Sequence, residues 1–145
     1  MIRDIRQEDK PVFLEMAKKF YSSKAVEHEI DRHIYETAFD TAVSNPSLIR
    51  AFIIEDNGIS AGFAFVSFYF ATEVGGLVVV LEDLYLDESC RGKGLGSKFI
   101  EFIEQEYPLA KRFHLEVAKE NTRAIDLYRK LGYDVLEYVQ MIKNF

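Results

Sequence analysis

Residues 77–96 read L-V-V-V-L-E-D-L-Y-L-D-E-S-C-R-G-K-G-L-G, and the rest of the chain is organised around this stretch. Its apolar start is typical of a strand that is buried on both faces of a sheet. Glu82 and Asp83 interrupt the apolar run, where an unpartnered charge would cost on the order of several kcal/mol or shift its pKa. A turn with three glycines and a segment with helical spacing follow. The pattern predicts a central strand, a glycine loop and a helix that begins at the loop.

The loop, R-G-K-G-L-G at residues 91–96, has the features of a phosphate site. Glycines allow close approach of the backbone, and the first N–H groups of a helix point at an anion that the helix dipole favours. Arg91 and Lys93 add positive charge. The Walker pattern is absent, and the glycine spacing is one residue short of the dinucleotide pattern. Three alternating glycines beside two cations exceed what a tight turn requires.

Length and composition set the class of protein. A chain of 145 residues predicts a single domain, residues 1–145, able to bury about 70% of its unfolded surface. The formal charge of −6 argues against nucleic acid as a partner. No apolar run reaches the roughly 20 residues that span a bilayer, so no membrane partner is expected. The single cysteine and the lack of a leader before Ile5 favour the cytoplasm.

Apolar periodicity and turn residues predict a single α/β (α+β) domain, in which helices cover both faces of a mixed, strongly twisted sheet that splays near the loop. The expected elements, in order, are a strand over 1–6, a helix capped by Asp9 and reaching Phe20, a helix over 27–43, strands over 48–55 and 59–71 joined by Asp56-Asn57-Gly58, the central strand from Leu77, a helix over 95–107, a strand over 112–117, a helix from Asn121 to Leu131 followed by Gly132, and an extended segment over 133–142.

Two motifs resemble those of the GCN5-related N-acetyltransferases. The loop resembles the cofactor signature [RQ]-x-x-G-x-[GA] of this family, through Arg91, Gly94 and Gly96. The second motif, N-x-x-A-x-x-x-Y-x-x-x-G-[FY], is matched by Asn121, Ala124, Tyr128, Gly132 and Tyr133. The expected order of elements is also similar to that of the family. Family members usually end with two further strands, whereas about a dozen residues follow Gly132 here, so the sheet edge is expected to be short, bent, or completed by a partner subunit in a homodimer.

The resemblance implies acetyl-CoA as cofactor and an amine, in a small molecule or a peptide, as acceptor. It implies direct attack of the amine on the acetyl group while both substrates are bound. The residues that the resemblance assigns to the cofactor are Leu84, Tyr85, Leu86, Arg91, Gly92, Lys93, Gly94, Leu95, Gly96, Ser97, Asn121, Ala124 and Tyr128.

The chemistry requires a base, because an amine of pKa near 10.4 is neutral only about one time in a thousand at pH 7.4. Glu82 is the candidate base, since some family members place a basic carboxylate in a similar L-E-D context. Side chains alternate along a strand, so Asp83 is expected on the opposite face unless a bulge exchanges the two. Either carboxylate could instead serve a structural ion pair. The resemblance assigns the general acid to Tyr128 and oxyanion stabilisation to backbone N–H groups around residues 84–86.

Other candidate residues carry less weight. His28, His33 and His114 lack the spacing of a metal site, and none is expected. Cys90 has no nearby histidine that would favour a nucleophilic role. Glu82, Asp83, Asp87 and Glu88 crowd the end of the central strand, which predicts a preference for cationic, polyamine-like acceptors over free amino acids. The alternative function is a non-catalytic acyl-CoA-binding module that regulates a partner.

Overall fold

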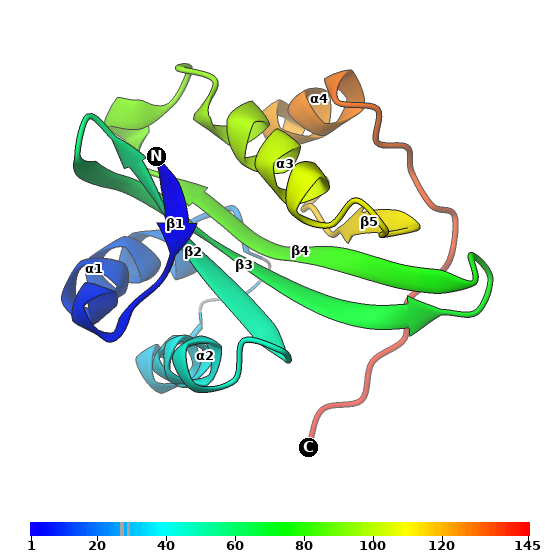
Figure 1. Ribbon diagram of the computed structural model, residues 1–145, viewed down its shortest axis with the longest axis horizontal. Coiled ribbons are helices and arrows are strands. Elements are labelled where there is room, and N and C mark those ends of the chain that lie inside the picture. The colour runs from blue at the N-terminus through cyan, green and yellow to red at the C-terminus, as the bar shows by residue number, and fades with distance from the viewer. Residues whose placement is uncertain (27, 29) are drawn as a thin grey trace.

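The computed structural model describes residues 1–145 except Glu27 and Glu29. Its described residues form one five-stranded sheet in the order β1-β2-β3-β4-β5 (Figure 1), antiparallel except for the parallel pair β4 and β5. The elements are β1 (Ile2–Asp4), α1 (Lys10–Tyr21), α2 (Arg32–Ser44), β2 (Ile49–Asp56), β3 (Ile59–Ala71), β4 (Gly76–Leu86), α3 (Leu95–Glu106), β5 (Arg112–Leu115) and α4 (Thr122–Lys130), with short 3-10 turns η1 (Gln7–Asp9) and η2 (Glu88–Cys90). The predicted fold class is confirmed.

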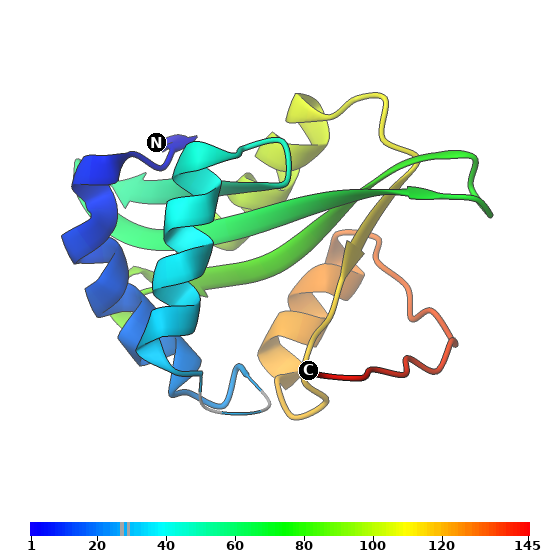
Figure 2. The same ribbon diagram turned by 90° about the horizontal axis from the view of Figure 1, so that it is seen from below.

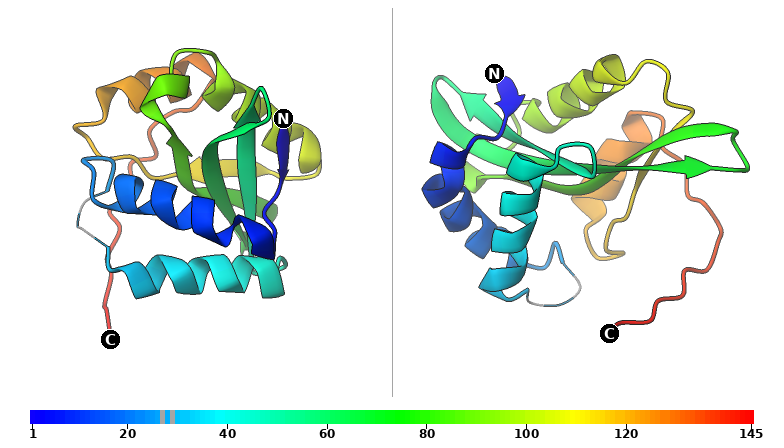
Figure 3. Two further views of the ribbon diagram at one scale, coloured as in Figure 1. Left: turned by 90° about the vertical axis from the view of Figure 1, so that its left-hand side faces the viewer. Right: turned by 60° about the horizontal axis from the view of Figure 1, so that its bottom comes forward.

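Helices cover both faces of the sheet, α1 and α2 on one side and α3 and α4 on the other (Figures 1 and 3). The side chains of β3 contribute to the hydrophobic cores on both faces of the sheet. Phe63 and Phe65 belong to the core under α1 and α2, whereas Ala64 and Val66 belong to the core under α3. Because side chains alternate along a strand, an unbroken apolar run is needed where both faces are covered.

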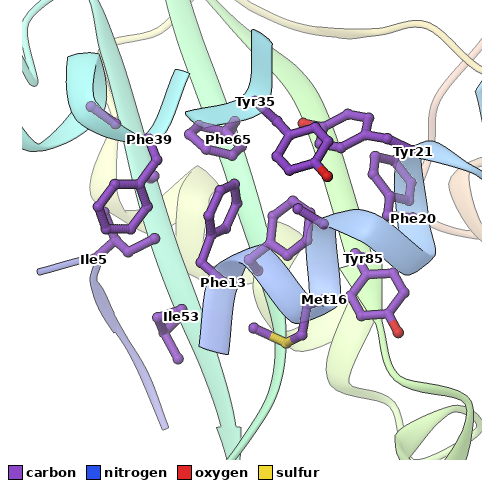
Figure 4. Packing of buried hydrophobic residues seen from close by; sticks show 14 residues of the cluster. Ile5, Phe13, Met16, Phe20, Tyr21, Tyr35, Phe39, Ile53, Phe65 and Tyr85 are labelled. Atoms are coloured by element: carbon purple, nitrogen blue, oxygen red, sulfur yellow. The ribbon is translucent and has the colours of Figure 1, made fainter. Parts of the chain in front are cut away.

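The core under α1 and α2 is built mainly from aromatic rings (Figure 4). Phe13 of α1 is fully buried, and its ring centroid lies 5.0 Å from that of Phe63 and 5.1 Å from that of Phe39 in α2. Further along α1, Phe20 contacts Phe63 and Tyr85 edge-on or tilted. These contacts fix the rotation of α1 over β3 and β4, and therefore the side chains that α1 directs at the central strand.

The hairpin between β2 and β3 forms as predicted. Asn57 and Gly58 both have positive φ, 51° and 79°, and Asp56 pairs with Ile59. This conformation matches the two-residue turn that suits the twist of antiparallel strands.

The predicted start of α1 is confirmed, and that of α2 needs correction. Asp9 occupies the N-cap position of α1, but its carboxylate accepts hydrogen bonds from Arg3 and from the Arg6 backbone N–H and makes no cap hydrogen bond to α1. α2 begins at Arg32, and the predicted start at residue 27 lies outside the described residues. The backbone N–H of Ile30 donates to Tyr21 O at the end of α1, so Ile30 serves the connection between the helices.

The predicted end of α4 is confirmed. Gly132 has φ 91°, its N–H donates to Arg129 O, and the N–H of Tyr133 donates to Tyr128 O. Together these bonds make the Schellman arrangement that closes a helix on a left-handed residue.

The C-terminal part of the prediction is only partly right. β5 ends at Leu115, not near residue 117, and residues 133–145 are extended without joining the sheet (Figure 2). Tyr138 donates a hydrogen bond of 3.3 Å to Glu73, which also pairs with Arg112 of β5. The large apolar side chains exposed in this segment are Val135, Leu136, Tyr138, Val139, Met141, Ile142 and Phe145. An extended segment without a paired neighbour strand does not become a strand.

No helix among the described residues is long and apolar enough to cross a membrane.

Candidate active site

The site is centred on a β-bulge in β4. Phe65 of β3 pairs with Asp83, and the next residue, Val66, pairs with Leu81, so Glu82 is an extra residue on β4. The core contacts show the consequence. Leu81, before the bulge, and Leu84, after it, both pack under α3. In a regular strand, two residues three positions apart would point to opposite faces. A bulge shifts the alternation of a strand by one residue and bends the strand.

The bulge brings Glu82 and Asp83 to the same face. Ser67 lies two residues after Phe65 on β3, on the face that α1 and α2 cover, and its hydroxyl donates to Glu82. Asp83 Oδ2 accepts a hydrogen bond of 2.6 Å from the hydroxyl of Tyr21 at the end of α1. Simple alternation had placed Asp83 opposite Glu82. That prediction is wrong, because two successive residues of a bulge share one face.

Beyond the bulge, one edge of β4 is open among the described residues, because β5 ends at Leu115. β4 pairs with β5 only from Val78 to Leu81. The N–H of Asp87 donates to Ala61 O, so the main-chain groups of Asp87 face β3. In an antiparallel ladder the main-chain groups of successive residues face the partner strand alternately. Leu84 and Leu86 therefore direct their main-chain groups away from β3. Consistent with this, Leu86 O accepts a hydrogen bond of 2.9 Å from Arg91 Nε.

Tyr85, which the sequence also assigned to the cofactor, is oriented differently from Leu84 and Leu86. By the same alternation its main-chain groups face β3, and its side chain is buried under α1, where its ring stacks on Phe63 at 5.5 Å. Leu84 and Leu86 thus lie at the open edge, and Tyr85 serves the core.

The glycine loop leads directly into α3. Gly92 and Gly94 have φ near 79° and 77°, and Gly94 is the N-cap of α3 without a side-chain cap. The first intrahelical bond runs from Lys98 N–H to Gly94 O. The amides of Leu95, Gly96 and Ser97 therefore precede the first helical hydrogen bond and are oriented as donors at the positive end of the helix dipole.

α4 approaches the loop and supplies a cation that the sequence prediction missed. Arg123 Nη2 lies 4.0 Å from the position that a Cβ on Gly92 would take. Leu127 packs against Gly96, where an added Cβ would lie 3.3 Å from Leu127 Cδ2. Asn121 accepts from the Ala124 N–H and caps α4, as predicted. The signal for Arg123 was its position in the first turn of a capped helix, which only the fold brings to the loop.

Tyr128 lies on the opposite face of the sheet from the carboxylates. It packs, half-buried, into the core that includes Leu84 and Leu86, with its ring 5.8 Å from that of Tyr133. Burial raises the pKa of Tyr128 to about 12, so its hydroxyl is protonated at neutral pH. The predicted acid and the predicted base therefore lie on the two sides of the open edge of β4.

The acidic cluster is less negative than its sequence implies. Hydrogen bonds from Ser89 and then from Lys19 lower the pKa of Asp87 to about 2, and Lys19 Nζ lies 3.1 Å from Asp87. Glu88 lies 3.8 Å from Arg91. Glu82 and Asp83 accept only hydroxyl hydrogen bonds from the described residues. The negative potential is therefore concentrated at the bulge.

Burial, together with the nearby Glu82 carboxylate, raises the pKa of Asp83 to about 6, although the hydrogen bond from Tyr21 acts in the opposite direction. On the basic side of the site, Lys93 pairs with Asp56 at 2.7 Å, and this hydrogen bond raises the pKa of Lys93. Among the described residues, no group of three His, Cys, Asp or Glu side chains could hold a metal ion.

These features fit acetyl-CoA. The uncapped first turn of α3, Arg91 and Arg123 suit a pyrophosphate, and the open main-chain edge at Leu84 and Leu86 suits the amides of the pantetheine arm.

Comparison with known proteins agrees with this geometry. The sequence matches the Acetyltransferase (GNAT) family over residues 2–133. It is 30% identical over 141 residues to thialysine N-epsilon-acetyltransferase of Mus musculus. This match covers 90% of this chain and 82% of the mouse protein. It is 36% identical over 58 residues to spermine/spermidine N(1)-acetyltransferase of Bacillus subtilis (strain 168), 38% of each chain. The match to the thialysine enzyme of Sus scrofa, 38% identical over 74 residues, spans 49% of this chain and 42% of that protein.

Solved structures share the fold. A possible acetyltransferase from Clostridium difficile 630 superposes with a TM-score of 0.85 at 15% identity, covering 100% of this chain and 97% of that one. The aminoglycoside N-acetyltransferase AAC(6')-Iy in complex with CoA superposes with a TM-score of 0.80 at 17% identity, covering 99% and 93%.

The chain belongs to the acetyltransferase (GNAT) family. At this level the predictions of an acetyltransferase, of acetyl-CoA as cofactor and of an amine as acceptor are confirmed. The alternative of a non-catalytic acyl-CoA-binding module gains no support.

A valine at position 94 tests the loop. Gly94→Val adds a branched side chain at a left-handed position, where the loop backbone would meet a phosphate. We expect the affinity for CoA, measured by titration calorimetry, to fall at least ~100-fold, or about 2.7 kcal/mol. Gly75→Val is the matched control, because Gly75 also has positive φ, 65°, with open space around it, but lies in the turn between β3 and β4. Unchanged CoA affinity in a folded Gly94→Val protein would contradict the assignment.

Proposed function

We propose that this chain transfers an acetyl group from acetyl-CoA to a primary amine of a small, polyamine-like cationic acceptor, by direct attack while both substrates are bound. The observation that supports this most strongly is the arrangement around the open edge of β4, with Glu82 and Asp83 on one face and Tyr128 on the other. Acetyl-CoA, when bound, supplies a thioester whose carbonyl carbon accepts a nucleophile.

The residues proposed to hold acetyl-CoA lie on three elements. Main-chain groups of Leu84 and Leu86 extend the open edge of β4, and the amides of 95–97 begin α3. Arg91 and Arg123 provide positive charge for the phosphates. Both loop cations have a carboxylate neighbour, and Lys93 has the smaller share because Asp56 is 2.7 Å from it, whereas Glu88 is 3.8 Å from Arg91.

Proton movements follow from the two faces. A carboxylate at the bulge takes a proton from the incoming ammonium group, which frees the nitrogen lone pair. The sequence assigned this role to Glu82, and the structure adds Asp83 on the same face. The amides of Leu84 and Leu86 offer hydrogen bonds to developing negative charge. Tyr128 keeps a proton on Oη for the departing sulfur, because its pKa, which burial raises to about 12, lies well above neutral pH.

The charge of the bulge suggests the class of acceptor. Two carboxylates without a cationic partner among the described residues attract amines that carry further positive charge and repel acceptors that carry a carboxylate. The names of two relatives give spermine or spermidine and thialysine as the acceptors of those proteins. Both kinds of amine are therefore acceptors of similar proteins. The site favours the polyamine.

We also propose a homodimer and a cytoplasmic location, and both remain predictions. The exposed apolar segment 133–145 and the outer side of β5, which pairs with no strand in the described part of the chain, support a homodimer. A monomeric profile in sedimentation equilibrium would refute it. The cytoplasmic location, expected from the single cysteine, would be tested by fractionation of the source cells.

The acceptor is tested by release of free thiol from acetyl-CoA with spermidine and with thialysine, at low and at high salt. We expect kcat/KM to favour spermidine by about tenfold or more at low salt, because the field of the bulge concentrates cations. The preference should shrink at high salt, where screening shortens the field. A preference for thialysine at low salt would contradict the proposed acceptor, and no thiol release with any amine of a wider panel would contradict the proposed function.

The general acid is tested by Tyr128→Phe, which removes the hydroxyl and keeps the ring. We expect kcat to fall roughly 100-fold or more while the free energy of unfolding stays near that of the wild type. Tyr133→Phe is the matched control, because burial also raises the pKa of Tyr133 to about 12 and its ring packs beside Tyr128. An unchanged kcat in Tyr128→Phe would show that Tyr128 has only a packing role.

A further inference from the structure

The hydrogen bond between Tyr21 and Asp83 joins the aromatic core to the reacting face. Tyr21 is the last residue of α1, and its Oη lies 2.6 Å from Asp83 Oδ2. Burial and then the Asp83 carboxylate raise the pKa of Tyr21 far above its usual value, so this hydroxyl is a donor throughout the physiological range. The direction of the hydrogen bond is thereby fixed, with Tyr21 donating and Asp83 accepting.

The tyrosine ring is held rigidly. Tyr21 and Tyr35 of α2 stack with centroids 5.1 Å apart and an interplanar angle of 12°, and both rings are buried (Figure 4). Phe20 contacts Tyr21 edge-on at 4.9 Å, and Phe63 lies 6.4 Å away. A ring packed on several sides keeps one rotamer, so the hydroxyl holds Asp83 Oδ2 in a single place.

The two carboxylates at the bulge are held differently. Glu82 is exposed and accepts a hydrogen bond from the hydroxyl of Ser67 on β3. Asp83 is partly buried and accepts from a fixed phenol. The described groups that face Asp83 are Tyr21 from α1, Phe65 opposite on β3, and Glu82 on β4 itself. Tyr35 of α2 stacks on the ring of Tyr21. No cation stands among these described neighbours, and the burial of Asp83 raises its proton affinity.

We infer that Asp83, and not Glu82, takes the proton from the acceptor amine, and that Tyr21 is the positioning residue that prepares Asp83 for this step. The inference rests on the proposed function. In the step, one N–H bond of the ammonium group breaks, its electron pair stays on nitrogen, and the proton passes to Asp83 Oδ1, the oxygen that Tyr21 does not occupy. Glu82 contributes charge that attracts the cationic acceptor and raises the proton affinity of its neighbour.

Protonation sets the expected pH dependence. Asp83 must be ionised to accept a proton, so kcat/KM should rise with pH through the Asp83 pKa of about 6. The Tyr21 hydrogen bond lowers this pKa, and the charge of Glu82 raises it. Tyr21→Phe should therefore move the acid limb to higher pH, and Glu82→Gln should move it to lower pH. Opposite shifts from two neighbours of one carboxylate are not expected from a structural role.

The experiment measures the titration of the Asp83 carboxyl carbon by NMR in the resting protein, together with the pH profile of kcat/KM for spermidine. In Tyr21→Phe we expect the Asp83 pKa to rise by about one unit, since one hydrogen bond to the charged form is lost. The acid limb should rise with it, so activity lost near pH 6 returns at higher pH. Tyr35→Phe is the matched control, because it removes a hydroxyl from the stacked ring but no hydrogen bond to Asp83. Its Asp83 titration should stay at the wild-type value.

The outcomes separate the two proposals. An Asp83 titration that does not move in Tyr21→Phe would overturn the role of Tyr21. An acid limb that disappears in Glu82→Gln but persists in Asp83→Asn would make Glu82 the base and overturn the assignment to Asp83. If the wild-type protein releases no thiol with any amine, the proposed function fails, and the NMR titration still decides whether Tyr21 sets the proton affinity of Asp83.

Discussion

One extra residue in the central strand determines most of what this protein can do. Glu82 opposes no residue of β3, and the resulting bulge bends β4 away from β5 after Leu81. β5 ends at Leu115, opposite Leu81, so among the described residues the ladder stops at the bulge and β4 has no partner strand on that side beyond it. The bulge thus lies at the start of an open edge and places both carboxylates beside it.

The rest of the fold keeps this local irregularity in place. Arg3 of β1 makes two hydrogen bonds of 2.8 Å with Asp9, which ties the start of α1 to the sheet. Phe13 then fixes α1 over β3, and Tyr21 at the far end reaches Asp83. On the other face, Leu127 of α4 packs on Gly96 and holds Tyr128 near the opposite side of the open edge. Two helices from distant parts of the chain therefore bring one hydroxyl each to the central strand.

The sequence predicted the features that depend on local chemistry. Glycines at 92, 94 and 132, the Asn57-Gly58 turn and the Asn121 cap are each decided by a few neighbouring residues. It could not predict features that depend on register. The bulge is invisible in the run L-E-D-L, because both carboxylates are compatible with a regular strand, and so the relative orientation of Glu82 and Asp83 was wrong. Arg123 and Tyr21 were missed as parts of the site because only tertiary packing brings them to it.

The most direct measurement is amide hydrogen exchange of the central strand with and without CoA. If the bulge opens β4 to receive the coenzyme, the amides of Leu84 and Leu86 should exchange more slowly when CoA is added. The amides of Asp83 and Tyr85, which the ladder register directs to β3, should serve as internal references and change little. Slower exchange confined to the loop at 91–96, with Leu84 and Leu86 unchanged at saturating CoA, would contradict the role given to the bulge.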